Sequence, residues 1–201
     1  MFDNGKLSLW DVFNNLSIGL ATLLIILFSV FFYVDFDHFK ILELLSKFSP
    51  VLIIIMPVLL LLLGMLVDAL SNRFHRTQIK IFRINKRVSR DQMEVEAKVR
   101  KLLPDIITEK TMFRYCKAFV SQNCKNNNVE VFLARFGFYR NFSFILFMSS
   151  FVSYYAFCSM MFSIIIFFLS RVFMSRSSHF LSLLESEVYY NYLASNIKKD
   201  F

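Results

Sequence analysis

Residues 49–90 read SPVLIIIMPVLLLLLGMLVDALSNRFHRTQIKIFRINKRVSR, an apolar stretch that stops against a basic one. The seventeen residues from Val51 to Val67 carry no charge, and at about 1.5 Å of helical rise per residue they nearly match the roughly 30 Å hydrocarbon core of a bilayer. Seven Lys or Arg residues follow between Arg73 and Arg90, and each would cost about 2.5 to 3.5 kcal/mol at the bilayer centre. This stretch therefore predicts a membrane-spanning helix over about 50–70 whose basic end lies in the cytoplasm.

The composition of the whole chain favours an integral membrane protein. Of its 201 residues, 56% are hydrophobic and 17% aromatic, and the mean hydropathy is +0.52. A soluble protein would have to bury several uncharged runs of fifteen or more residues in a domain too small to cover them, which argues against that class. The three cysteines form no CxxC pair, so neither a disulfide scaffold nor a zinc site is indicated; they are Cys116, Cys124 and Cys158.

Two other uncharged stretches complete the expected set of spans. Residues 16–34 are long enough for an uncleaved first span, and residues 35–49 follow with the pattern of a short amphipathic helix at the outer interface. Residues 141–170 carry no charge, and a single helix of that length would be about 45 Å long and strongly mismatched to the bilayer. Two spans require a turn, for which we expect the polar cluster Ser149–Tyr155, and a hairpin would return the basic tail to the cytoplasm.

The predicted fold is an all-α integral membrane protein of the bacterial inner membrane, with four transmembrane helices and both termini cytoplasmic. Residues 1–71 are expected to form an N-terminal transmembrane hairpin, with spans at about 16–34 and 50–70. A basic cytoplasmic helical insert over 72–135 lies between spans 2 and 3. The C-terminal transmembrane hairpin covers 136–174, and residues 175–201 form a cytoplasmic C-terminal helix.

The insert has the pattern of a folded segment. Between Asn72 and Arg140 there are sixteen Lys or Arg and six Asp or Glu. Ser89 and Gln92 fit a capping box that opens a helix through Leu103 with Val95, Val99, Leu102 and Leu103 inside. A second helix over about 108–122 would bury Met112, Tyr115, Cys116 and Phe119. The tail carries one apolar side, with Leu184, Val188, Tyr189 and Tyr192 among its residues, and should dock on the insert or on a neighbouring subunit.

Five residues are candidates for helix packing inside the membrane. Gly64, Asp68 and Ser71 share one helix face at i, i+4 and i+7, and Asp68 can pair with Arg73 or Arg140 at the cytoplasmic rim. The other two, Ser159 and Ser163, form a small-xxx-small face.

The basic residues after span 2 are candidates for binding a partner or a lipid surface; they are Arg83, Lys86, Arg87 and Arg90. Anionic lipid headgroups attract such residues by about 1 kcal/mol each, and an acidic protein surface would do the same. Nucleic acid is the weakest candidate because no RNA or DNA motif accompanies the charges. The sequence contains no phosphate loop, no metal-ligand spacing and no catalytic set, so it predicts neither an enzyme nor a bound cofactor.

The layout resembles a known family. The paired spans Leu16–Val34 and Val51–Val67, the basic helical insert and the phenylalanine-rich hairpin Phe142–Phe173 are similar to the small four-span membrane proteins of bacterial antiphage defence operons, such as the membrane subunit of the Kiwa system. The resemblance covers the whole length but rests on layout, with no motif to transfer residue by residue. It implies a homo-oligomeric membrane component that detects infection and works with a soluble cytoplasmic partner.

Two functional hypotheses follow. In the first, the protein is an oligomeric membrane sensor or scaffold whose cytoplasmic helices recruit a soluble partner. In the second, it is a pore-forming effector that depolarises the membrane. Apart from Asp68 at the cytoplasmic rim, no acid lies within the expected spans, which favours the first.

Overall fold

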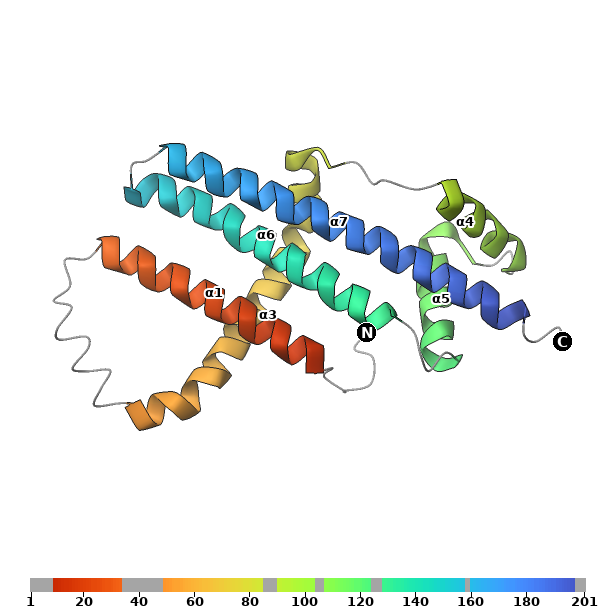
Figure 1. Cartoon of the computed structure of the whole chain (residues 1–201), viewed down its shortest axis with the longest axis horizontal. Coiled ribbons are helices and arrows are strands. Elements are labelled where there is room, and N and C mark those ends of the chain that lie inside the picture. The colour runs from red at the N-terminus through yellow and green to blue at the C-terminus, as the bar shows by residue number, and fades with distance from the viewer. Residues whose placement is uncertain are drawn as a thin grey trace. The chain divides into compact units, whose positions relative to one another are not determined.

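The structure is a computed structural model that describes residues 9–33, 49–84, 90–103, 107–123, 128–157 and 160–197. In these ranges the only regular elements are helices, which confirms the all-α prediction (Figure 1). The six helices are α1 (Leu9–Tyr33), α3 (Ser49–Phe82), α4 (Arg90–Leu102), α5 (Glu109–Asn123), α6 (Val129–Phe157) and α7 (Met160–Ile197). The interfacial helix expected over 35–49 falls almost entirely outside the described residues.

Four helices are long and apolar enough to cross a membrane, as predicted for a multi-pass membrane protein. Their apolar segments are Asp11–Ser29, Ile54–Phe82, Val129–Tyr155 and Met160–Asn196. Large apolar side chains cover the outside of these segments, and Ile54 and Met161 are 76% and 77% exposed. Such an outside fits a lipid environment, because acyl chains and apolar side chains mix without cost.

The chain divides into two compact units. The first unit consists of Met1–Arg83 and Gly137–Ser175, and the second unit consists of Ile84–Phe136 and Arg176–Phe201. The helices α6 and α7 each contribute one part to the first unit and another to the second.

Two helices continue where the sequence predicted a break. Serines 149, 150 and 153 were expected at a turn, yet α6 runs through them to Phe157 and α7 begins at Met160. The hydroxyl of Ser149 donates to the carbonyl of Ile145 at 2.7 Å, and that of Ser150 to Phe147 at 2.7 Å. Because these hydroxyls bond within the helix, the polar cluster does not require a turn. The expected tail helix is likewise continuous with the fourth span, since residues 160–197 contain neither Gly nor Pro.

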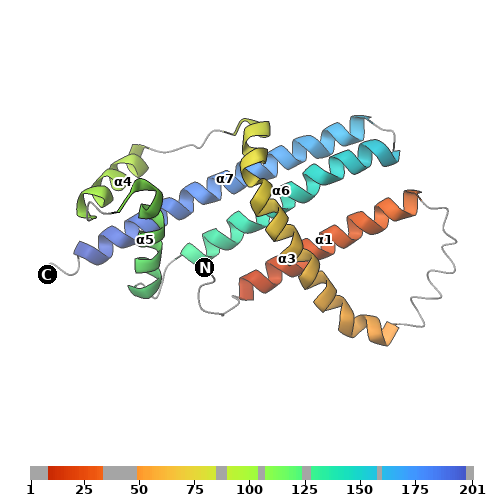
Figure 2. The same ribbon diagram turned by 180° about the vertical axis from the view of Figure 1, so that it is seen from behind.

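The helix α3 also extends beyond its expected end near residue 70. Both ribbon views show it crossing α1, α6 and the first half of α7 at a steep angle (Figures 1 and 2). Ser71, Gln78 and Phe82 are buried on one face of its second half, whereas Arg73 and Lys80 are exposed. The ring of Phe82 makes edge contacts with the rings of Phe147 and Phe167, at 5.8 and 5.3 Å between centroids. Residues 72–82, expected at the start of the insert, therefore belong to the first unit.

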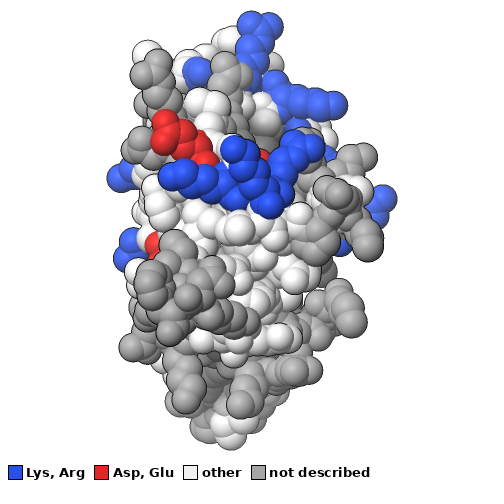
Figure 3. All heavy atoms as spheres, turned by 90° about the vertical axis from the view of Figure 1, so that its right-hand side faces the viewer, with Lys and Arg blue, Asp and Glu red and all other residues white. Residues whose placement is uncertain are grey.

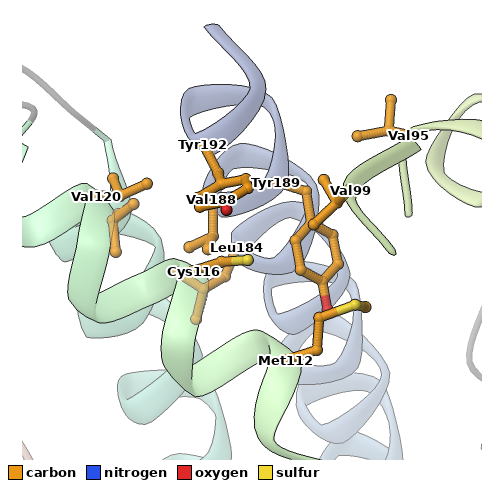
Figure 4. Packing of buried hydrophobic residues seen from close by; sticks show 10 residues of the cluster. Val95, Val99, Met112, Cys116, Val120, Leu184, Val188, Tyr189 and Tyr192 are labelled. Carbon is orange, nitrogen blue, oxygen red and sulfur yellow. The ribbon is translucent and has the colours of Figure 1, made fainter. Parts of the chain in front are cut away.

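The second unit has its own apolar core (Figure 4). Its buried residues come from four helices: Val95 and Val99 of α4, Met112, Cys116 and Val120 of α5, Val129 of α6, and Leu184, Val188, Tyr189 and Tyr192 of α7. The C-terminal half of α7 thus docks on the central segment of the same chain, which is one of the two arrangements expected from its apolar side.

Two residues expected inside this core lie outside it. Leu102 is 55% exposed and Tyr115 is 44% exposed. On α4 the buried face continues through Leu103, which packs against the core. On α5 the buried residues Met112, Cys116 and Val120 follow one another at i, i+4 and i+8, so Tyr115 falls one residue off the face.

Candidate functional site

A cluster of polar side chains joins α3 to α6 inside the first unit. We call it the α3–α6 polar cluster; its members are Asp68, Ser71 and Asn72 of α3 and Arg140 and Asn141 of α6. Arg140 Nη2 donates to Asp68 Oδ1 at 2.6 Å, and Asn141 Nδ2 donates to the same oxygen at 2.8 Å. The hydroxyl of Ser71 donates to Asn141 Oδ1. Two charges and three neutral groups therefore satisfy one another at one crossing.

Arg140 is the centre of this cluster. Its Nε lies 3.2 Å from Ser71 Oγ and 3.3 Å from Asn141 Oδ1, and its Nη1 donates to Asn72 Oδ1 at 3.3 Å. The side chain of Arg140 is only 9% exposed, whereas that of Asp68 is 47% exposed. A buried guanidinium needs several acceptors to replace water, because an uncompensated charge in an apolar environment is costly. The arrangement places the cation inside and leaves part of the carboxylate open.

The spacing along α3 explains how the cluster forms. Asp68, Ser71 and Asn72 stand at i, i+3 and i+4, so they lie on one helix face. Of the two cations that the sequence offered to Asp68, the structure pairs it with Arg140; Arg73 is exposed on the outside of α3. Asn141 was not among the predicted site residues, although a polar amide at the start of an uncharged stretch is a usable signal for helix contact in a membrane.

Gly64 belongs to a different contact, the crossing of α3 with α1. A side chain at Gly64 would meet the backbone carbonyl of Asn15, and a side chain at Gly19 would meet the backbone carbonyl of Leu60. The two glycines are reciprocal, because each stands four residues from the position that the other glycine touches. Backbone contact this close is possible only without a Cβ atom, so these two glycines set the distance between the helices.

Serines hold α6 against α7 at seven-residue intervals. Ser143 and Ser170 each donate to the other's carbonyl oxygen, at 2.9 and 2.7 Å. One step toward the turn, Ser163 donates to the carbonyl of Ser150 at 2.6 Å. Within the second unit, Ser177 donates to the carbonyl of Phe136 at 3.2 Å. Positions 163, 170 and 177 face 150, 143 and 136, as a heptad pattern requires of antiparallel helices.

Only part of this serine ladder, which consists of Ser143, Ser163, Ser170 and Ser177, was predicted. Ser163 lies in it, but Ser159, chosen with it at four-residue spacing, is outside the described residues. The seven-residue spacing of Ser163, Ser170 and Ser177 was present in the sequence and is the signal that would have found the ladder. Ser170 is fully buried.

The basic residues after α3 are only partly described. Arg83 ends the helix with a positive φ of 49° and donates its backbone N–H to the carbonyl of Lys80 at 3.2 Å. A residue in this left-handed conformation stops a helix and turns the chain away from the helix axis. Lys86 and Arg87 are outside the described residues, and Arg90 is the first residue of α4.

In the second unit, polar contacts fix α4 on α7. Ser182 donates to Gln92 Oε1 at 3.0 Å, and Gln92 Nε2 donates to Glu185 at 3.4 Å. In the apolar core of the same unit, burial raises the pKa of the Cys116 thiol from about 9 to about 11. The thiol therefore stays protonated at neutral pH and packs as a small apolar group, since the thiolate is the reactive form.

Neither a metal site nor a relative adds to this picture. Within the described ranges, no three His, Cys, Asp or Glu side chains are grouped so that they could hold a metal ion. The chain matches no family model, no curated protein and no solved structure.

Proposed function

We propose that the protein is an oligomeric sensor or scaffold of the bacterial inner membrane, and that its second unit recruits a soluble cytoplasmic partner. The observation that carries the proposal is the separate core of that unit, where α4 and α5 pack on the C-terminal half of α7. A connection between two membrane hairpins needs no core of its own. A unit with ten buried apolar residues instead provides a rigid surface that a partner can recognise.

The charge of the second unit supports an acidic partner. Residues 84–136 contain eleven Lys or Arg and six Asp or Glu. On α4 and α5 the exposed cations include Lys98, Lys101 and Arg114. Lys and Arg gather in a band across the face drawn in Figure 3, with few acidic residues beside them. Such a band would steer an oppositely charged surface into contact.

The same charges support a cytoplasmic location for the second unit. Short loops rich in Lys and Arg remain on the cytoplasmic side during insertion. In the four-span arrangement, sixteen basic residues between Asn72 and Arg140 would lie on one side of the membrane, and only Lys40 and Lys47 would lie on the other. Anionic headgroups of the inner leaflet would then contact the basic residues nearest the membrane.

We also propose that the protein acts in bacterial antiphage defence. This part of the proposal rests on the layout of the chain, in which two apolar hairpins flank a basic helical segment. In that setting the membrane helices would detect a change in the membrane during infection, and the second unit would hold or release the partner. A homo-oligomer would present several copies of the recruiting surface, which raises the effective concentration of a bound partner.

Charge reversal tests the recruiting surface. Arg83, Lys86, Arg87 and Arg90 are changed together to Glu, and the protein is purified from cells with whatever binds it. A matched variant carries four reversals on α4 and α5 instead, at Lys98, Lys101, Arg114 and Lys117. We expect wild type to bring down a soluble protein and the first variant to lose it, because residues 83–90 make the direct contact. The second variant should keep most of it, because Lys98, Lys101 and Arg114 only steer the partner toward that contact.

Lipid attraction alone gives a different result. If the cations only bind anionic lipid, both variants should lose the same amount of binding free energy, about 1 kcal/mol per reversed charge. Added salt would weaken binding in the same way. Failure of wild type to bring down a partner, or equal losses in the two variants, would refute recruitment through residues 83–90. An ion flux across liposomes that contain the wild-type protein would support the pore hypothesis in its place.

A further inference from the structure

A cavity of about 350 Å³ lies among α1, α6 and α7 in the first unit. Its volume falls in the range of ligand pockets, roughly 300 to 1,000 Å³. Its walls are mainly apolar, with Leu24 and Phe28 from α1, Leu146 and Val152 from α6, and Phe162 and Ile166 from α7. All three helices belong to the set that is long enough to cross a membrane.

Two of the three serines of the cavity offer little to a polar ligand. Ser29 donates its hydroxyl to the carbonyl of Ile25 at 2.7 Å, and Ser149 donates to Ile145 at 2.7 Å. Both hydroxyl protons are therefore used within their own helices. A ligand with several polar groups would leave them without partners among the apolar walls, which costs free energy for each group.

Two of the three cavity serines lie toward one end of the cavity. Ser29 stands four residues before the end of α1 at Tyr33, and Ser153 stands four residues before the end of α6 at Phe157. Leu146 lies seven residues deeper on α6, or about 10 Å of helical rise. Ser29 and Ser153 thus lie at the end of the cavity near the helix ends, together with Phe28 and Phe162. Leu146 lies deeper, and Ser149 stands between the two levels on α6.

From this arrangement we propose that the cavity binds one acyl chain of a membrane phospholipid. The chain lies along Leu146, Ile166 and Leu24, and the ester end of the lipid lies beside Ser29 and Ser153. Acyl chains are the apolar groups that surround these helices in a bilayer, so a cavity open to the hydrocarbon region meets them at high concentration. The proposal does not depend on the recruitment of a soluble partner.

Photocrosslinking tests this site with the full chain. The protein is reconstituted in vesicles of phosphatidylethanolamine and phosphatidylglycerol that contain a phospholipid with a diazirine on one acyl chain. After irradiation, mass spectrometry of the digested protein locates the adducts. We expect at least fivefold more adducts on Ile25, Leu146 and Ile166, which line the cavity and are only partly exposed, than on Ile54 and Met161, which are 76% and 77% exposed.

Two variants distinguish the cavity from lipid at the protein surface. Leu146→Trp fills the cavity, whereas Met148→Trp adds the same ring at a 50% exposed position of the same helix. We expect only Leu146→Trp to remove the excess of adducts, and Ile166→Phe, which fills the cavity from α7, to act in the same way if Leu146→Trp fails to fold. Adducts that follow exposure alone, or that persist in a folded cavity-filling variant, would overturn the proposal.

Discussion

The two units of this protein differ in the contacts that join their helices. In the first unit, a charged pair, serines and glycines join the helices beside a small buried apolar cluster of Ile18, Val67, Phe144 and Ile145, and large apolar side chains cover the outside. In the second unit, the contacts are made by Val, Leu, Met and Tyr side chains, and the exposed residues of α4 and α5 include Lys98, Lys101 and Arg114. The same two helices, α6 and α7, take part in both.

The difference follows from the solvent that each kind of surface suits. Lipid is as apolar as a leucine side chain, so helices in a membrane gain nothing by burying leucine, and hydrogen bonds and close backbone approach hold them together. Where the outside is charged, burying apolar area contributes about 25 cal/mol per Å². Polar substitutions should therefore matter most in the first unit and apolar truncations in the second.

Removing Asp68 should give the largest effect. In Asp68→Ala, Arg140 keeps its charge at a site where its side chain is 9% exposed, and an uncompensated buried charge costs roughly 3 to 5 kcal/mol. Arg140→Met should cost less, because the carboxylate that it leaves behind is half exposed. Thermal unfolding of the purified protein in one detergent would compare the two variants.

The double variant sharpens this test. Asp68→Ala with Arg140→Met should be more stable than Asp68→Ala alone, since no unpaired charge remains. Arg73→Met is the matched control, because Arg73 is an exposed cation on the same helix. A loss for Arg73→Met as large as that for Asp68→Ala would show that the buried charge is not the cause.

Truncation of Leu184 should have the next largest effect and should be confined to the second unit. Leu184 is 1% exposed in the core of that unit, and Leu→Ala in such a place costs about 2 to 5 kcal/mol. We expect faster amide hydrogen exchange in α4 and α5, with little change at the crossing of α1 and α3. Leu102→Ala, at a 55% exposed position of α4, is the control, and equal exchange rates in the two variants would contradict the assignment of this core.

Loss of one serine hydroxyl should have a smaller effect. Ser170→Ala removes a hydrogen bond to Ser143 but keeps the helices close, and hydrogen bonds between membrane helices contribute on average about 0.6 kcal/mol. Ser175→Ala is the control, since Ser175 is an exposed serine of α7. The oligomeric mass and the melting temperature in detergent would be measured for both variants. A loss of several kcal/mol would mean that Ser170 does more than join two helices.

The long apolar helices were predictable because an uncharged run of membrane length is a strong signal, and Val51–Val67 is such a run. The apolar side of the tail was also predictable, since Leu184 and Val188 repeat at helical spacing, but the surface on which it docks was left open between the insert and a neighbouring subunit. Which residues of a helix are buried was harder to predict. Leu102 and Leu103 are adjacent, and only the structure shows that Leu103 packs inward.

The contacts of the first unit were harder to predict for a physical reason. The pairing of Ser143 with Ser170 depends on the register of two antiparallel helices, and that register is set by the position of the turn. The turn was misplaced because serine hydroxyls can bond within a helix as well as end one. The choice between Arg73 and Arg140 as the partner of Asp68 likewise depends on how α3 crosses α6, which no local pattern encodes.

The stability of the second unit should also depend on pH. Burial raises the pKa of the Cys116 thiol from about 9 to about 11, so between these values the unfolded chain has released a proton that the folded chain still holds. Stability then falls as pH rises, because the unfolded state binds fewer protons. This contribution should be complete below pH 9, decline between pH 9 and 11, and level off above that.

Urea denaturation of the full chain in detergent, followed by circular dichroism, would measure the decline. Cys116→Ala lowers stability by a constant amount but removes the titrating group, so its decline between pH 9 and 11 should be shallower. Parallel curves for the two proteins would assign the pH dependence to other groups, and the thiol would then be packed less tightly than the core requires.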